Sequence, residues 1–306
     1  MNKLISRALA TIFLVFSSTT VSLAAEAAPE VTTTALRGPL YLLHGMGGNV
    51  VASVGIDGIM LVDDDYATYA EAYQKAISTL SQSDLAPSFI LNTHWHGDHT
   101  GSNDHWGMRG TIIFAHTNVR GRMSSRQENK MTGKVTEPSP MAALPVVTYG
   151  DSIAFHFNGG DVEVQHYPGG HTDGDSVVYY AQENVVHMGD LFFRDRFPYV
   201  DISAGGNLLD YTANVEKVLQ RVSDNTLIVP GHGELANKQD LQRFHQMLLE
   251  TTAAVKASLA EGMGVEAIIE KGLGAKWSSW GTGFINEASW IKLIAASPVT
   301  VVAAAY

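Results

Sequence analysis

Short apolar runs, separated by turns rich in glycine, histidine and aspartate, recur along the chain from about residue 40 onward. Runs of four to eight β-branched and aromatic residues, bounded by turn residues, are typical of β-strands. The runs are residues 50–54, 59–62, 88–91, 112–115, 162–164, 176–180, 185–188 and 227–229. The first two flank the turn at residues 55–58 and therefore predict a hairpin.

Other segments carry apolar residues at the spacing of an α-helix. These predicted helices are residues 66–80, 208–222, 240–259 and 265–271. Strands and helices therefore alternate in two strand-rich zones, each followed by helix. This order favours an α/β fold in which two sheets pack together with helices outside. Since nothing resembles a linker or a short repeat, we expect one domain over residues 26–306.

Two segments do not follow this pattern. Residues 122–140 are polar and lack periodicity, which predicts an exposed loop, or a lid over a site. Residues 1–25 begin with two cations, continue with an apolar stretch over residues 8–16, and end with small residues. This order predicts a signal peptide and a periplasmic or secreted protein. A buried N-terminal helix is the alternative, because the stretch is short for a membrane anchor.

The amino-acid composition excludes several classes of chemistry and partner. The 306 residues include no cysteine, which excludes a thiol nucleophile, a disulfide and any cysteine-bound metal. The formal net charge of −11 argues against a nucleic-acid partner, because phosphate binding needs clustered cations. No later segment is long enough to span a membrane. We therefore expect a small-molecule substrate, while the oligomeric state is left open. The 12 histidines are many for such an acidic chain.

Histidine and aspartate are densest directly after the predicted strand 88–91. Four potential metal ligands lie there within six residues: His94, His96, Asp98 and His99. Imidazole and carboxylate groups are the ligands expected for zinc where thiolates are absent. Three more follow later strand-like runs and adjoin glycine: His171, Asp190 and His232. A single such histidine is usually structural, but the repeated pattern predicts one metal site at the sheet edge where these strands end.

The order His94-x-His96-x-Asp98-His99, followed by His171, Asp190 and His232, resembles that of the metallo-β-lactamase-fold hydrolases. The resemblance extends from about residue 38 to residue 249 and implies a four-layer αββα sandwich. It implies a first metal ion held by His94, His96 and His171. It implies a second metal ion held by Asp98, His99 and His232, with Asp190 as the bridge. We therefore expect two Zn²⁺ ions per chain.

The resemblance also implies a chemistry. Two divalent ions about 3.5–4 Å apart share a water molecule, lower its pKa toward 7 and polarise the substrate oxygen. Asp98 and Asp190 are the expected catalytic carboxylates, since Asp98 can orient the water and Asp190 keeps the ions close. We expect direct hydrolysis of an ester, thioester, lactone or lactam bond. Asp173, Asp175 and Thr100 are expected either to orient the ligands or simply to form turns.

The substrate is less well specified. The β-lactamases of this fold have cysteine or another departure where Asp190 stands, and one subclass has a substrate-binding lysine where Phe193 stands. Arg194 is adjacent and could replace that lysine. Residues 168–179 and 205–207 nevertheless resemble that subclass. We therefore expect better activity on neutral esters or lactones than on β-lactams, with a genuine β-lactamase as the alternative.

The sequence also bears on other classes of protein. Residues 44–48, His-Gly-Met-Gly-Gly, resemble the oxyanion loop of serine esterases, but the chain lacks the Gly-x-Ser-x-Gly motif that this chemistry needs. A di-iron redox member or a non-catalytic metal-binding member of the fold are the remaining alternatives. The other six histidines are expected at the surface or in packing: His105, His116, His156, His166, His187 and His245. The aromatic residues Trp277, Trp280, Phe284 and Trp290 are expected to pack in the core, or else to form a cleft wall.

Overall fold

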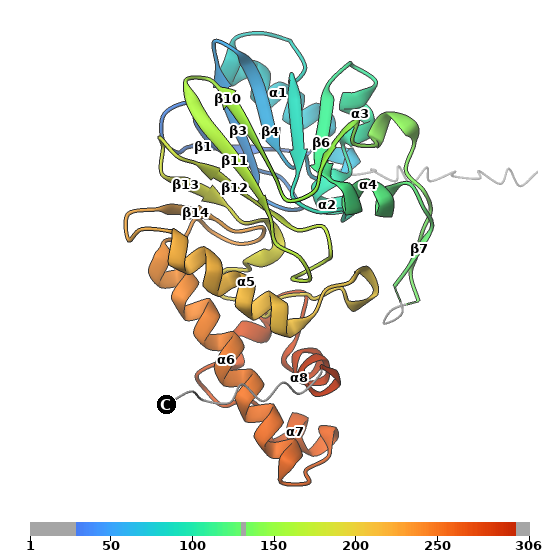
Figure 1. Cartoon of the computed structure of the whole chain (residues 1–306), viewed down its shortest axis with the longest axis vertical. Coiled ribbons are helices and arrows are strands. Elements are labelled where there is room, and N and C mark those ends of the chain that lie inside the picture. The colour runs from blue at the N-terminus through green and yellow to red at the C-terminus, as the bar shows by residue number, and fades with distance from the viewer. Residues whose placement is uncertain (1–28, 130–132, 298–306) are drawn as a thin grey trace, which may run out of the picture.

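Two β-sheets form the centre of the molecule, which is a computed structural model describing residues 29–129 and 133–297 (Figure 1). The predicted signal peptide, residues 1–25, lies outside the described residues. The seven-stranded sheet has the order β1-β2-β3-β4-β5-β6-β9. Its strands are β1 (Thr32–Ala35), β2 (Leu40–His44), β3 (Val50–Gly55), β4 (Gly58–Val62), β5 (Phe89–Asn92), β6 (Ile112–His116) and β9 (Val147–Tyr149). The first four strands are antiparallel, and the last four run parallel to one another.

The second sheet has five strands in sequence order. They are β10 (Ser152–Phe157), β11 (Gly160–His166), β12 (Ser176–Tyr180), β13 (Val185–His187) and β14 (Leu227–Val229). Only β13 and β14 are parallel, because helix α5 connects them across the sheet. Parallel neighbours need such a crossover, whereas short turns connect β10 to β11 and β12 to β13. The loop 167–175 connects the antiparallel strands β11 and β12.

Helices cover the outer faces of both sheets. On the first sheet lie α1 (Ala70–Ser81), α3 (Asn103–Gly107) and α4 (Thr117–Met123), while the short α2 (Gly97–Thr100) follows the end of β5. On the second lie α5 (Leu208–Arg221) and α6 (Lys238–Ala260), with α7 (Val265–Lys271) and α8 (Glu287–Ala296) packed against α6 (Figure 1). The 3-10 turns are η1 (Ala67–Tyr69), η2 (Met141–Ala143), η3 (Gly189–Leu191), η4 (Ile202–Ala204) and η5 (Ser278–Thr282).

Alternation along the strands builds three apolar layers, because successive side chains point to opposite faces of a sheet. In β3, Val51 packs toward the second sheet, against residues such as Val162 and Val178. Its neighbour Val50 packs the other way, with Tyr73 and Ile77 of α1. The outer face of the second sheet packs against α5, α6 and α8 in a third cluster. The layers are therefore helix, sheet, sheet and helix, as expected.

The C-terminal aromatic residues separate into two groups. Trp277, Trp280 and Trp290 are buried in the cluster around α6, which confirms their packing role. Phe284 is 86% exposed, and its ring stands edge-on to Tyr199 with centroids 5.9 Å apart. Phe284 is therefore free of the core and lies beside the loops that carry the metal-ligand candidates.

All eight predicted strands and all four predicted helices are present, with boundaries shifted by a few residues. The structure adds elements that the sequence analysis missed, including β1, β2, β9 and β10. Residues 122–129 and 133–140 are mostly exposed, as expected, but contain the end of α4 and the antiparallel pair of β7 (Gln127–Glu128) and β8 (Val135–Thr136). No helix in the described part of the chain combines the length and apolarity needed to cross a membrane.

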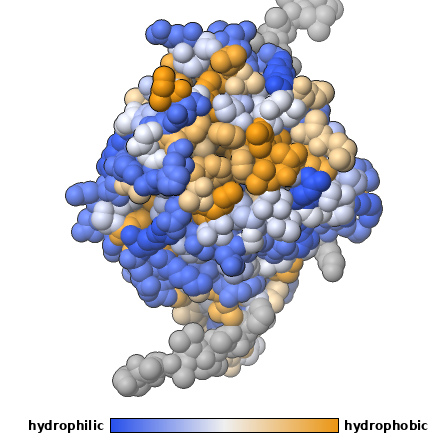
Figure 2. Space-filling view, turned by 45° about the horizontal axis from the view of Figure 1, so that its top comes forward, coloured by the Kyte–Doolittle hydropathy of each residue, from blue (hydrophilic) through white to orange (hydrophobic). Residues whose placement is uncertain are grey.

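The surface is polar over most of the face seen in Figure 2, with an apolar area near its middle. Among the exposed apolar side chains are Ile112, Val146 and Val147, near the outer edge of the first sheet. The edge strand of this sheet, β9, has only three residues, and a short edge strand limits pairing with other chains.

Candidate metal centre

The seven predicted ligands come together at one edge of the sandwich. Residues 94–99 follow β5, Asp190 follows β13, and His232 follows β14, so these side chains leave the sheets at strand ends. His171 lies on the loop between β11 and β12. The ligand atoms form two groups, each within 4.8 Å: His94, His96, His171 and Asp190, and then Asp98, His99 and His232. The convergence expected from the sequence is therefore present.

Asp190 lies between the two groups. Its Oδ2 is 3.4 Å from Nε2 of His171 and 3.9 Å from Nε2 of His94. Its Oδ1 is 3.1 Å from Nε2 of His99 and 3.4 Å from Nε2 of His232. One carboxylate oxygen thus faces each group, which is the geometry that a bridging ligand requires.

Hydrogen bonds fix which ring nitrogen each histidine of the first group offers. His171 donates from Nδ1 to the carbonyl oxygen of Tyr199 at 2.8 Å, which leaves Nε2 as its acceptor. His96 donates from Nε2 to the Asp201 carboxylate at 3.0 Å, which leaves Nδ1. In neutral rings these two nitrogens carry lone pairs, and they face each other at 2.8 Å.

Asp63, at the end of β4, orients one histidine from each group. His99 donates from Nδ1 to Oδ2 of Asp63 at 2.7 Å. The hydroxyl of Thr93 donates to the same carboxylate at 2.8 Å, so it must accept from Nδ1 of His94, which is 3.1 Å away. Both imidazoles therefore turn Nε2 toward Asp190. Such partners behind a ligand fix its orientation and raise its basicity.

The arrangement fits a bound cation. Nε2 of His94 is buried and has no hydrogen-bond partner among the described residues, which is costly for a polar atom. The two facing lone pairs of His96 and His171 repel each other unless a cation or a proton lies between them. Nitrogen and oxygen donors in this number suit zinc and related divalent ions. We conclude that both groups could hold a metal ion.

The two groups differ in protonation when no metal is bound. Burial lowers the pKa of His171 to about 4 and lowers that of His94 well below its usual value, so both are neutral near pH 7. Burial acts in the same direction on His232, but the Asp190 and Asp98 carboxylates outweigh it and raise the pKa of His232 to about 9. The second group therefore holds a proton where a metal ion would bind.

The carboxylates remain ionised. Burial disfavours the charged form of Asp98, yet His99 and His232 outweigh it and lower the pKa of Asp98 to about 2. The surrounding histidines likewise hold the pKa of Asp190 well below its usual value, despite its burial. Both groups can therefore act as metal ligands or as hydrogen-bond acceptors at neutral pH.

Glycine is needed where backbone passes close to these side chains. A Cβ at Gly48 would lie 2.2 Å from Cε1 of His99. A Cβ at Gly231 would lie 2.1 Å from Oδ1 of Asp190. Any side chain at either position would displace a proposed ligand, so the glycines beside the site have a steric role.

For Asp173, Asp175 and Thr100, the structure shows the second of the two expected roles, in loops and turns. Thr100 donates to backbone carbonyls, and Asp173 pairs with Arg122. Asp175 is buried and accepts bonds from the amide and hydroxyl of Thr172, so it stabilises the turn around His171. None of the three bonds a ligand side chain, because Thr100 and Asp175 bond within their own turns and Asp173 bonds Arg122 of α4.

The residues that do hold the ligands were missed by the sequence analysis. They are Asp63, Thr93, Tyr199 and Asp201. Asp63 carried a signal, since it follows a strand in the same way as the ligands do. No sequence signal marked Asp201, because 105 residues separate it from His96.

Of the six histidines expected in packing, His187 is fully buried and bonds the carbonyl of Asn49 at 2.9 Å.

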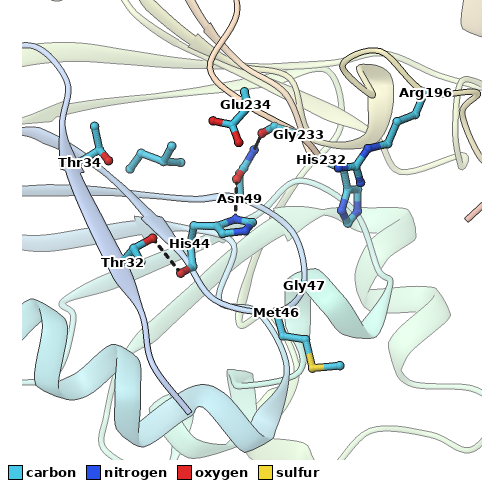
Figure 3. Close-up of a pocket in the computed structure, with 11 residues that line it drawn as sticks. Thr32, Thr34, His44, Met46, Gly47, Asn49, Arg196, His232, Gly233 and Glu234 are labelled. Atoms are coloured by element: carbon cyan, nitrogen blue, oxygen red, sulfur yellow. Dashed lines mark hydrogen bonds between the residues drawn. The ribbon is translucent and has the colours of Figure 1, made fainter. Parts of the chain in front are cut away.

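A cavity of about 330 Å³ adjoins the second group and is partly lined by His232 (Figure 3). Its other walls include His44 at the end of β2, Asn49, Arg196 and Glu234. Figure 3 shows Arg196 extending toward His232, while His44 and Asn49 lie on the opposite wall. The cavity is therefore polar and open beside the candidate metal centre.

Arg194 does not reach this cavity, so the expectation that it could replace a substrate-binding lysine is wrong. Its guanidinium donates to the carbonyl of Leu235 and lies 3.6 Å from Asp240 of α6. Phe193 instead stacks on the ring of His232, with centroids 5.1 Å apart. Arg196, two residues further along, is the cation that lines the cavity.

Comparison with known proteins gives a consistent result. A model of the metallo-beta-lactamase superfamily matches residues 61–232. An uncharacterised protein of Mycobacterium leprae is 29% identical over 178 residues, covering 55% of this chain and 79% of the relative. The "Probable metallo-hydrolase YqgX" of Bacillus subtilis is 26% identical over 178 residues, covering 54% and 79%. A metallo-beta-lactamase structure from Pontibacter korlensis superposes with a TM-score of 0.60 at 18% identity, covering 72% of this chain and 99% of that one.

Proposed function

Because the chain belongs to the metallo-beta-lactamase superfamily, as the motif predicted, we propose that it is an exported hydrolase with two zinc ions. Membership confirms the fold and the broad class, a metal-dependent hydrolase, and the ligand cluster supports the expectation of a metal site. The number and identity of the metal ions, the substrate and export by the segment 1–25 belong to the proposal.

The observation that carries the proposal is the position of Asp190. Its two oxygens face two separate sets of histidine nitrogens at 3.1 to 3.9 Å. A single-metal site would need only one of these sets. With metal ions held by these two sets of residues, the site would supply an activated water and polarise the substrate oxygen.

The residues of the chain supply orientation and hydrogen-bond acceptance. His94, His96 and His171 present fixed nitrogens, because Thr93, Asp201 and Tyr199 hold the other side of each ring. Asp98 is only partly buried, and its Oδ2 is 3.3 Å from Nε2 of His232. Since its pKa is lowered to about 2, Asp98 stays ionised at neutral pH, and its carboxylate can accept a hydrogen bond from the attacking water and orient it.

We propose neutral esters or lactones as the preferred substrates. Phe193 stacks on His232 where a substrate-binding lysine would otherwise stand, and Arg194 is engaged with α6. Arg196 and Glu234 bring opposite charges to the cavity, so it offers no clear excess of positive charge for a carboxylate. The acidic chain as a whole also disfavours anionic substrates.

A substrate panel on zinc-loaded protein tests this proposal. We expect a higher kcat/KM on a neutral lactone than on a carbapenem at the same zinc loading, with all activity lost after chelation. A carbapenem value near the diffusional range of ~10⁸ M⁻¹s⁻¹, with negligible lactone turnover, would establish a genuine β-lactamase instead. The variant Arg196→Ala would then show whether this cation binds the lactam carboxylate.

Export is tested separately. Mass spectrometry of protein recovered from the native host should show a chain that begins near residue 25 or 26. A chain that retains residues 1–25 would contradict the signal-peptide prediction without affecting the metal centre.

A further inference from the structure

The glycine-rich segment 44–48 has no role in the proposed function so far. Its backbone cannot form an oxyanion hole, because the amides are already bonded. The amides of Met46 and Gly47 donate to the carboxylate of Asp65 at 2.9 and 2.8 Å. The amide of Gly48 donates to the carbonyl of Asp98 at 3.0 Å. The remaining chemical group of this segment is the imidazole of His44.

Asn49 fixes the orientation of that imidazole. The side-chain amide of Asn49 donates to the carbonyls of Pro230 and Gly233, both at 2.9 Å, so its Oδ1 must be the acceptor facing His44. Nδ1 of His44 lies 3.1 Å from that oxygen and therefore carries a hydrogen. As one ring nitrogen is fixed as a donor, the other is left for chemistry.

Asn49 is itself rigidly held. It is buried, its backbone amide donates to the carbonyl of Gly231 at 2.8 Å, and its carbonyl lies 2.9 Å from Nε2 of His187. These bonds join Asn49 to the loop that carries His232. His44 is thus positioned relative to the metal centre by a continuous set of hydrogen bonds, although it lies on a different sheet.

The free edge of the His44 ring faces the cavity that His232 also lines (Figure 3). The side chain of His44 is exposed and makes no other hydrogen bond within residues 29–129 and 133–297. An oriented histidine at the wall of a substrate cavity can exchange a proton with bound substrate and with solvent.

The proposed hydrolysis needs such a proton donor. A poor leaving group, such as an alkoxide, must gain a proton as its bond to the acyl carbon breaks. Asp98 and Asp190 are not placed to supply it, because their carboxylate oxygens face the ligand histidines at 3.1 to 3.9 Å. The histidines of the centre cannot supply it when their free nitrogens bind metal. Among the cavity walls, His44 is the remaining imidazole.

We propose that His44 is a catalytic residue, the general acid that protonates the leaving group bound in this cavity. This role rests on the proposed hydrolase function. The water oxygen forms a bond to the acyl carbon, and the bond from that carbon to the leaving atom breaks. The leaving atom keeps the electron pair and takes the proton from Nε2 of the His44 imidazolium, which becomes a neutral ring that still donates from Nδ1 to Asn49. The proton lost by the water passes to solvent, from which His44 regains one.

Leaving-group dependence tests this role. Esters of one acid with a series of leaving groups, from nitrophenol to simple alcohols, are hydrolysed by zinc-loaded wild type, His44→Gln and His44→Ala. We expect kcat to fall roughly 10²–10⁴-fold for the alcohols, the range usual for loss of a general acid, and little for nitrophenol, which leaves without a proton. The dependence of log kcat on leaving-group pKa should therefore become steeper.

The controls separate this role from the proposed function. His156→Gln changes a histidine that is 85% exposed on β10 and should leave the slope unchanged. Zinc content, measured by elemental analysis, should be the same in all variants. An unchanged slope in both His44 variants, or equal losses for every leaving group, would overturn the role of His44 alone. A loaded wild type that hydrolyses no ester would overturn the proposed function, and this role with it.

Discussion

The two ligand groups share Asp190 but differ in how the protein holds them. In the first group, His94 and His171 are fully buried, and each histidine has a partner on its outer nitrogen. In the second group, His99 is held by Asp63, whereas His232 is 19% and Asp98 23% exposed beside the cavity. The first group presents oriented histidine nitrogens, and those of His94 and His171 are neutral without metal. The second is an open group in which His232 holds a proton without metal. The difference indicates an anchored ion and an ion placed to meet substrate.

Replacing the shared ligand should have the largest effect. Asp190→Asn should lower kcat by orders of magnitude while the fold is retained, because a neutral amide is a poor bridge between two cations. Hydrolysis rate and circular dichroism check this result. Wild-type turnover in this variant would show that Asp190 does not join the two groups.

Removing one histidine from each group should separate the ions. His94→Ala should lose mainly the first ion and His232→Ala mainly the second, because each leaves the other group intact. Elemental analysis gives the metal content, with His156→Ala as the control at an exposed position. Identical metal loss in the two variants would mean that the groups do not bind separately.

The residues behind the ligands should act more weakly and selectively. Asp201→Asn should weaken only the first ion, since Asp201 holds His96. Asp63→Asn should weaken both ions, because Asp63 holds His99 directly and His94 through Thr93. Losses of about 10–100-fold in affinity are usual for such partners and can be measured by competition with a chromophoric chelator. A weaker affinity for only one of the two ions in Asp63→Asn would contradict the role of Asp63 in holding both His94 and His99.

The smallest expected effect is a difference in pH dependence. Without metal, His232 keeps its proton up to about pH 9, so the second ion must displace it. The apparent affinity of that ion should rise as pH increases from 6 to 9. His171 has already lost its proton above about pH 4, so affinity for the first ion should change less over this range. Zinc titrations in weakly binding buffers at several pH values would show the two slopes, and equal slopes would contradict the comparison.

The ligands could be predicted from the sequence because short, local sequence signals mark each of them. Residues 94–99 lie in one short loop, and Asp190 and His232 each follow an apolar run and a glycine. Strand ends meet at a sheet edge, so the pattern alone placed all seven ligands in one site.

The outer partners could not be predicted in this way, because they depend on contacts between distant loops. Asp201 reaches His96 from a 3-10 turn 105 residues away, and Tyr199 uses a backbone carbonyl that any residue could supply. The cavity is formed where β1 and β2 meet the loop after β14. Strand β1 is a short exposed edge without apolar alternation, so no periodic signal marks it. Strand β10 did carry alternation, at Ile153, Phe155 and Phe157, and was overlooked.

Native mass spectrometry of the protein at saturating zinc tests the central claim most directly. The geometry around Asp190 predicts two zinc ions per chain, with the second lost first as the pH is lowered. A protein that holds one ion or none at saturating zinc would contradict the assignment of a dinuclear centre.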